Sequence, residues 1–344
     1  MRAGGWIAGT AVLAVLGFAP PASAADVPAP ETLCTVTDPR ISELSGLVSD
    51  GERWYGINDG GSKVQVFVLG RDCKVQKVIS QGTDPYDVED LARTADGKLW
   101  LADTGDNSKK RDTVALIELS TSGKATLHRL TYPDGQHDVE ALIMDPRGVP
   151  YLITKDVLGD AKVYRPTGPL ASPGPTPLEK VGSLNIKETD TPGGPIGSFG
   201  SVLVTGAAAT ADGSVIALRT YTDAYLYAVS GGDIMAALQR TPVRVPLPGE
   251  KQGEALAFEP DGTLLSGGEG VGQPIRAVKG AAALAGRSDG SSPVAGKSTA
   301  GTNGTDEDEA GDGAGLPVLP AVGVALVVVL GGWFGFSRLR RRGR

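Results

Sequence analysis

The sequence has few of the side chains that bind transition metals. It contains two cysteines, Cys34 and Cys73, and two histidines, His128 and His137. With only two cysteines and two histidines the chain has few soft ligands, so a zinc site is not expected. Neither histidine falls in the register of the repeat described below, so a serine–histidine mechanism has little support.

An excess of basic residues is also lacking. The chain has 40 Asp and Glu against 33 Lys and Arg, and its net charge is −7. Five of the arginines lie at the extreme C-terminus. Proteins that bind nucleic acid present a basic surface to the phosphates. The composition therefore excludes nucleic acid as a partner.

The N-terminus predicts export. Residues 1–24 carry one arginine before the uncharged run 7–19, and Ala22-Ser23-Ala24 supplies the small residues of a cleavage site. This is the pattern of a signal peptide that is cut after Ala24. An uncleaved anchor is the alternative, but the apolar run is short for a membrane span.

The C-terminus predicts a membrane anchor. Residues 316–336 are uncharged and long enough for one transmembrane helix, and the tail 337–344 holds the five arginines. Arginines next to a span mark its cytoplasmic side. We therefore expect a single-pass protein of the cell membrane, with an extracellular domain and a cytoplasmic C-terminus. A cell-wall sorting signal is the alternative, but residues 316–320 lack its usual Thr-Gly.

Between these ends we expect one folded domain, residues 25–280, and a linker. Residues 281–315 are rich in Gly, Ser, Ala and Thr and include the acidic run 306–309. Such a composition buries no core and predicts a disordered spacer. Both cysteines lie in the exported domain, where a pair usually forms a disulfide, here Cys34–Cys73.

An internal repeat predicts the fold. The 49 glycines and 24 prolines favour many turns over long helices. Five segments align, each with a glycine eight residues after its first position: Glu43–Gly51, Glu89–Gly97, Glu140–Gly148, Thr205–Gly213 and Glu254–Gly262. Each segment resembles a strand, a tight turn and a second strand, and further strand-like runs follow.

Four antiparallel strands per repeat are typical of a β-propeller, so we predict an all-β protein. Five blades fill the domain, and the segment around Cys34 is expected to complete the last one. A sixth blade hidden in residues 185–203 is the alternative. Residues 233–239 are expected to form a short helix between strands.

Propeller geometry predicts a site at the central channel. The starts of the inner strands and the ends of the second strands share one face of a propeller. The first set is Glu43, Glu89, Glu140, Thr205 and Glu254, and the second is Asn58, Asp59, Asp103, Lys155, Arg219 and Glu269. Seven carboxylates and two cations would then meet at one rim. We expect this rim, apart from Asn58 and Thr205, to bind a ligand, with Lys155 and Arg219 holding an anionic group.

Oxygen ligands without sulfur or imidazole favour calcium or magnesium as a cofactor. The loop that contains Asp103, Asp106 and Asn107 follows a strand and presents carboxylate and amide oxygens together, so we predict these residues as metal ligands with Glu89. The alternative is structural, because acidic residues in propellers also cap loops and connect blades.

Several motifs carry a resemblance to a known family. They include Trp54-Tyr-Gly-Ile-Asn-Asp-Gly60, Leu101-Ala-Asp-Thr-Gly-Asp-Asn107, His137-Asp-Val-Glu-Ala-Leu142, Ala217-Leu-Arg-Thr-Tyr221 and Gln252-Gly-Glu-Ala255. On these motifs the chain resembles actinobacterial secreted propellers that are similar to the "esterase-like activity of phytase" family. The resemblance implies a secreted propeller fold.

Three functions are compatible with these patterns. The first is a surface module that binds a cation or a small ligand at its acidic rim. The second is a calcium-dependent phosphoesterase or esterase-like hydrolase, in which metal ions polarise the substrate and activate water. The third is a module that binds another protein at the cell surface. The sequence leaves open whether the domain is an enzyme.

Overall fold

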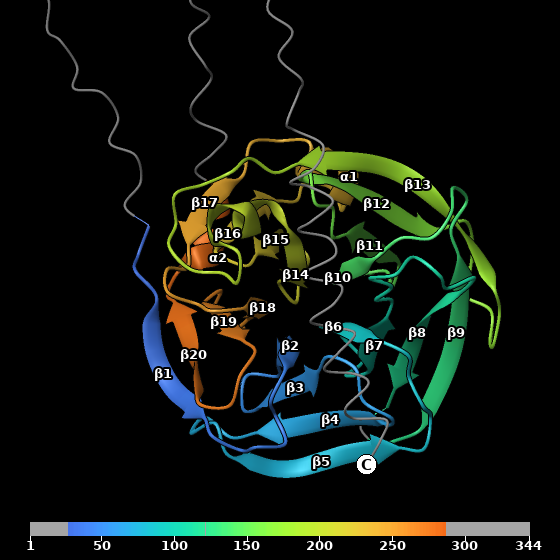
Figure 1. The fold of residues 1–344 in the computed structure, drawn as a ribbon, viewed down its shortest axis with the longest axis horizontal. Helices are drawn as coiled ribbons and strands as arrows, with labels where there is room; N and C mark the ends of the chain where they lie inside the picture. The colour runs from blue at the N-terminus through green and yellow to red at the C-terminus, as the bar shows by residue number, and fades with distance from the viewer. Residues whose placement is uncertain (1–26, 121, 287–344) are drawn as a thin grey trace, which may run out of the picture.

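The computed structural model of the chain describes residues 27–120 and 122–286. Within them, twenty strands form five antiparallel groups of four around a common axis (Figure 1), and a short parallel pairing of residues 130–131 with 176–177 joins two of the groups into one sheet of eight strands. This arrangement is a β-propeller, as predicted, and the described strands make five blades. The stretch 185–203 contains one short 3-10 helix, η1 (Gly197–Val202), and no strand beyond Asn185, so a sixth blade is not found there.

The blades follow one another in chain order. The first contains β2 (Leu44–Ser49), β3 (Trp54–Asn58), β4 (Val64–Leu69) and β5 (Val75–Gln81). The second contains β6 (Val88–Arg93), β7 (Leu99–Asp103), β8 (Val114–Leu119) and β9 (Ala125–Thr131). The third contains β10 (Val139–Met144), β11 (Pro150–Thr154), β12 (Asp160–Pro166) and β13 (Thr176–Asn185). The fourth contains β14 (Val204–Ala209), β15 (Val215–Thr220), β16 (Asp223–Ala228) and β17 (Val243–Pro246).

The fifth blade joins the two ends of the domain. It contains β18 (Gly253–Phe258), β19 (Leu264–Gly268), β20 (Gln273–Val278) and, as its outer strand, β1 (Glu31–Val36). Strand β1 pairs antiparallel with β20, which confirms that the segment around Cys34 completes the last blade. Cys34 is bonded to Cys73, which lies in the turn between β4 and β5 of the first blade. The predicted disulfide therefore links the first blade to the last.

The hydrophobic core is divided into five clusters, one between each pair of neighbouring blades. Trp54 and Phe67, for example, pack against the fifth blade, whereas Tyr55 and Ile57 pack against the second. Side chains alternate between the two faces of a strand, and here both faces are covered. This explains why inner strands such as β10 are buried along their whole length. Contacts between blades, rather than within one, hold the ring together.

Two short helices lie at the edge of this core. Helix α1 (Ile234–Leu238) is capped by Asp233, which confirms the helix expected there. Helix α2 (Ala281–Ala285) occupies the first residues of the predicted linker, and its buried alanines and Leu284 pack between the fourth and fifth blades. The folded region thus extends beyond residue 280, because these small apolar residues fit that interface.

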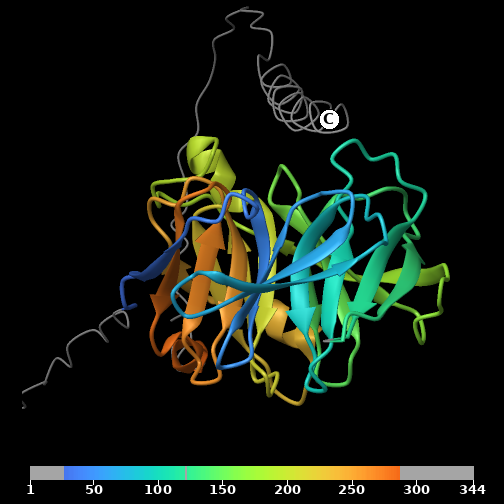
Figure 2. The ribbon, with the colours of Figure 1, turned by 90° about the horizontal axis from the view of Figure 1, so that it is seen from below.

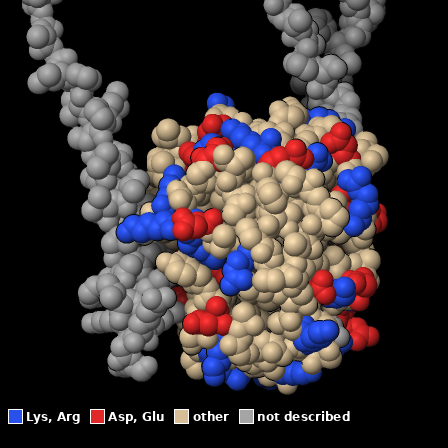
Figure 3. Space-filling model, turned by 90° about the vertical axis from the view of Figure 1, so that its right-hand side faces the viewer, with Lys and Arg blue, Asp and Glu red and all other residues tan. Residues whose placement is uncertain are grey.

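Viewed edge-on, the ring is flattened, with η1 on one face and α2 on the other (Figure 2). On the side of the ring shown in Figure 3, acidic and basic side chains are interspersed around an uncharged area. The predicted signal peptide, the rest of the linker, the membrane span and the tail lie outside the described residues. Within the described residues, no helix has the length and apolarity needed to cross a membrane.

Candidate functional site

The site begins with a β-bulge at the start of every inner strand. In each blade the pairing between the inner and second strands shifts at the same level. The residues left unpaired by these shifts are Ser45, Glu89, Glu140, Thr205 and, in the fifth blade, Glu254 with Ala255. A bulge bends its strand and turns the extra side chain in a new direction. Three glutamates, Glu89, Glu140 and Glu254, thereby occupy equivalent places on three blades.

The ladder corrects the predicted place of Glu43. The sequence repeat aligned it with Glu89, but the bulge residue of the first blade is Ser45. The cause lies in the turn: Gly51 comes two residues after Ser49, the last paired residue of β2, whereas Gly97 comes four residues after Arg93, so an alignment on the turn glycines is offset by two. Glu43 corresponds instead to Asp87 and Asp138, two residues before the bulge.

Two overlapping groups of carboxylates meet at this level. Asp59, Asp87 and Glu89 form one group, and Glu89, Asp138 and Glu140 form the other. In each group, one oxygen per residue lies within 4.8 Å of the others, and Glu89 belongs to both. We call these five residues together with Glu254 and Glu269 the acidic mouth. Its side of the ring is the mouth face, and the side with the hairpin turns is the turn face.

Burial makes the acidic mouth electrostatically costly. It raises the pKa of Glu89 and Glu140 well above the ordinary value, and neighbouring carboxylates such as Asp138 raise both further. Burial and the adjacent Glu254 raise the pKa of Glu269 to about 11. Glu254 Oε2 and Glu269 Oε1 are buried and have no hydrogen-bond partner among the described residues. The cluster therefore favours either protons or a bound cation.

One ammonium group lies among these carboxylates. Lys155 Nζ is 2.6 Å from Glu140 Oε1 and 5.1 Å from the centre of the Tyr221 ring. Burial lowers the pKa of Lys155, but Glu140, Glu254 and Asp138 outweigh this and raise it well above its usual value. Lys155 is thus a permanent cation at the predicted place, and it balances only part of the negative charge.

The loop predicted to bind metal covers the acidic mouth instead. Asp103 accepts the backbone N–H groups of Tyr86 and Asp87 and pairs with Arg111 at 3.1 Å. Asp106 accepts the N–H groups of Lys110 and Arg111, and Asn107 is exposed. Of the four predicted ligands, Glu89 alone belongs to a carboxylate group. Asp103 and Asp106 hold the loop in place.

Gly105 shows how closely this loop approaches the cluster. A Cβ atom at Gly105 would overlap Glu89 Oε1 and come within 2.7 Å of Asp87 Oδ2. Only glycine leaves room for these two carboxylates, because any other residue would add that atom. The Asp103–Asn107 motif is therefore part of the site as a wall, not as a set of ligands.

Arg219 does not point into the acidic mouth. Its side chain is fully buried, and its three nitrogens donate to backbone carbonyls and to Glu250 at 2.7 Å. In the ladder it stands opposite Gly206, at the position that Ala102 holds in the second blade. That position faces the next blade, so Arg219 connects the fourth and fifth blades. The residue that follows β15 at the mouth is Tyr221.

Sequence reasoning missed Asp87 as a site residue and did not assign Asp138 to the rim. The signal was the repeated string Asp-Val-Glu, which ends at Glu89 in one blade and at Glu140 in the next. In each string the first acid precedes the strand and the second is the bulge residue, and the two acids belong to one carboxylate group. A search for this alternation would have found all four carboxylates.

Comparison with known proteins finds no matching family model and no matching curated protein. Among solved structures, the chain is similar to glucose dehydrogenase, with 11% identity, coverage of 74% of this chain and 100% of that one, and a TM-score of 0.42. It is also similar to aldose sugar dehydrogenase from Escherichia coli (13% identity, 72% and 98% covered, TM-score 0.41) and to virginiamycin B lyase from Staphylococcus aureus (12% identity, 70% and 71% covered, TM-score 0.35). The propeller assignment rests on the strand pairing of the chain itself.

Proposed function

We propose that the acidic mouth binds divalent cations, with calcium as the best fit, and that this site receives a small ligand from the mouth face. The observation that carries the proposal is Glu89, whose carboxylate belongs to two groups of three oxygen ligands within 4.8 Å. Oxygen donors without nitrogen or sulfur suit hard cations such as calcium. We further propose that the domain is extracellular and anchored in the cell membrane by residues 316–336.

Two cations bridged by Glu89 could also support hydrolysis. Such a pair would polarise a phosphoester or ester and lower the pKa of a bound water. Lys155 would then hold the anionic group of the substrate, because Arg219 is committed to the blade interface. This makes a calcium-dependent phosphoesterase or esterase-like hydrolase the enzymatic form of the proposal. Turnover of a model phosphomonoester that requires calcium and is lost in Lys155→Met would support it.

The experiment for cation binding is thermal unfolding of the full chain in chelator and in increasing calcium. Free calcium at a hundredfold excess over Kd should stabilise the folded state by about 3 kcal/mol. Glu89→Gln removes the shared ligand and should abolish most of this gain. Glu52→Gln is the matched control, since Glu52 is an exposed residue of a turn on the other face. Equal melting temperatures with and without calcium would contradict the proposal.

A second candidate function is binding of another protein. Four of the five large hydrophobic residues that are exposed in the described part lie on loops of the mouth face: Tyr86, Val157, Leu158 and Val271. Leu158 is 79% exposed. An exposed apolar surface on one face can serve as an interaction site. Replacing Leu158 and Val271 by serine should weaken capture of a surface partner without changing calcium stabilisation.

A further inference from the structure

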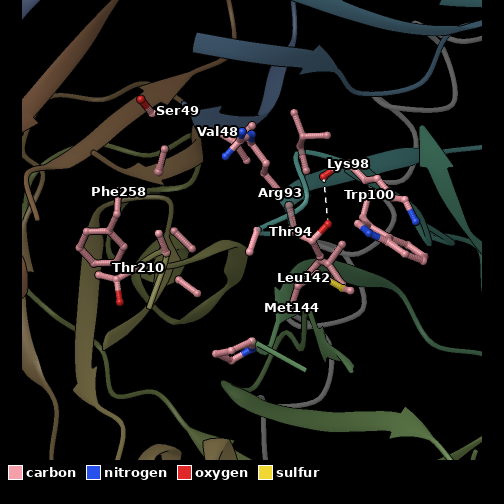
Figure 4. Close-up of a pocket in the computed structure, with 18 of the residues that line it drawn as sticks. Val48, Ser49, Arg93, Thr94, Lys98, Trp100, Leu142, Met144, Thr210 and Phe258 are labelled. Atoms are coloured by element: carbon pink, nitrogen blue, oxygen red, sulfur yellow. Dashed lines mark hydrogen bonds between the residues drawn. The ribbon is translucent and has the colours of Figure 1, made fainter. Parts of the chain in front are cut away.

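The turn face has a cavity of its own. It measures about 500 Å³ and is lined by the ends of all five inner strands and by the turns that follow them (Figure 4). Cavities of a few hundred to a thousand cubic ångströms suit small organic molecules. None of the residues of the acidic mouth lines it. It is therefore separate from the proposed cation site.

The floor of this cavity closes the propeller axis. Leu47, Leu91 and Leu142 line the cavity and are almost completely buried. Next to them Asp90, which is 0% exposed, accepts the N–H groups of Leu91, Leu142 and Ala207 from three successive blades. Its carboxylate therefore lies near the propeller axis, between the acidic mouth and the cavity. A ligand in the cavity would not reach the acidic mouth through the ring.

The walls of the cavity combine apolar and polar side chains. Val48, Leu142, Met144 and Phe258 lie around it in Figure 4. Trp100, which is 8% exposed, forms part of the wall beside Thr94 and Lys98, and its Nε1 has no hydrogen-bond partner among the described residues. The cavity thus offers apolar side chains beside polar groups.

Among the charged side chains at the edge of the cavity, one basic residue has no acidic partner within the described residues. The acids have partners: Asp50 pairs with Arg53 and Tyr55, Asp96 with Lys98, Asp145 with Arg147, and Glu259 with Arg71 and Trp54. Arg93 also lines the cavity, and within residues 27–120 and 122–286 it forms no ion pair. Its guanidinium is therefore available to an anion, with which it can form two parallel hydrogen bonds.

We propose that the turn-face cavity is a second binding site, which takes a small aromatic or alicyclic carboxylate. The ring system lies against Met144, Leu142 and Phe258, and the carboxylate is held by Arg93. The apolar ring system of the ligand packs against the apolar side chains of the walls. The guanidinium, which has no ion-pair partner, selects an anion over a neutral molecule of the same shape. This site does not depend on the cation site of the other face.

The experiment is calorimetric titration of the full chain with 2-naphthoate and with the neutral 2-naphthamide, in the presence of chelator. We expect saturable binding of one naphthoate, and at least tenfold weaker binding of naphthamide. Arg93→Gln should remove this difference and leave naphthamide binding unchanged. Arg129→Gln is the matched control, an exposed arginine on β9 away from the cavity. Added calcium should not change either affinity, which keeps the outcome independent of the cation site.

A variant that fills the cavity tests its location. Ala209 lines the cavity, and Ala209→Trp should abolish binding of both probes while the melting temperature shows that the fold is kept. If that variant does not fold, Arg93→Gln decides. The proposal is overturned if naphthoate shows no saturable binding, or if naphthoate and naphthamide bind equally well to the unaltered chain and to Arg93→Gln.

Discussion

Asp90 allows a quantitative test of how the blades are held together. Its Oδ1 accepts the N–H of Leu91, and its Oδ2 accepts those of Leu142 at 2.7 Å and Ala207 at 3.1 Å. In Asp90→Asn the carboxamide keeps one oxygen and replaces the other by an NH2 group. Even the better orientation, with the oxygen toward Leu142 and Ala207, leaves the Leu91 N–H facing another donor.

A buried donor without an acceptor costs about 1–3 kcal/mol. For a domain of this size, each kcal/mol lowers the melting temperature by about 2–4 °C. We therefore expect Asp90→Asn to melt about 2–12 °C below the unaltered protein. Thermal unfolding followed by circular dichroism measures this, with the exposed Asp96→Asn as control. A variant as stable as the parent would show that the three N–H groups do not depend on this carboxylate.

Three further predictions concern the site and the ring. Because burial raises the pKa of Glu89, and that of Glu269 to about 11, the calcium-free domain should gain stability from this cluster as pH falls and lose it as pH rises through those values. The melting shift caused by calcium should therefore grow from pH 5 to pH 9, and a larger shift at pH 5 would refute this. Gly105→Ala should weaken calcium stabilisation at least tenfold in apparent Kd, because its Cβ displaces Glu89; an unchanged calcium titration would contradict the close approach. Replacing Cys34 and Cys73 by serine opens a loop of 39 residues, which should cost roughly 4 kcal/mol in urea unfolding, and a loss below 1 kcal/mol would argue against the loop-entropy estimate.

The fold could be predicted because its signals are local. Turn glycines such as Gly97 and Gly213 recur at a fixed distance from apolar strands, and this repeat is visible without any tertiary information. The sequence also indicated that the segment around Cys34 completes the last blade, because the last repeat has no evident fourth strand before the linker. The boundary at residue 280 was less visible, since the run Ala281–Ala285 has the small-residue composition of a linker and packs only because an apolar surface meets it.

The site was predicted less well because side-chain direction depends on the ladder. In the first blade the turn glycine comes two residues earlier after the last paired residue, and an alignment on that glycine places Glu43 wrongly at the bulge level. The sequence predicted that Arg219 ends a strand, but β15 continues through Thr220. Arg219 is therefore a paired residue within the strand, and its guanidinium points toward the next blade. Asp103 and Asp106 are acids in a loop, and nothing local indicates that backbone N–H groups already use their oxygens.

Because β1 pairs with β20, the fifth blade can form only after the last strand of the domain has been synthesised. Glu31 lies opposite Ala277, so residues from the first and last parts of the domain must meet before the fifth blade exists. Contacts between residues so distant in sequence slow folding, because a long chain must be closed before they form. During synthesis, β1 emerges first and has no partner until the rest of the domain has followed. A shortened chain that ends before β20 leaves β1 without its pairing partner and removes Ile275 and Ala277 from the core between the last and first blades.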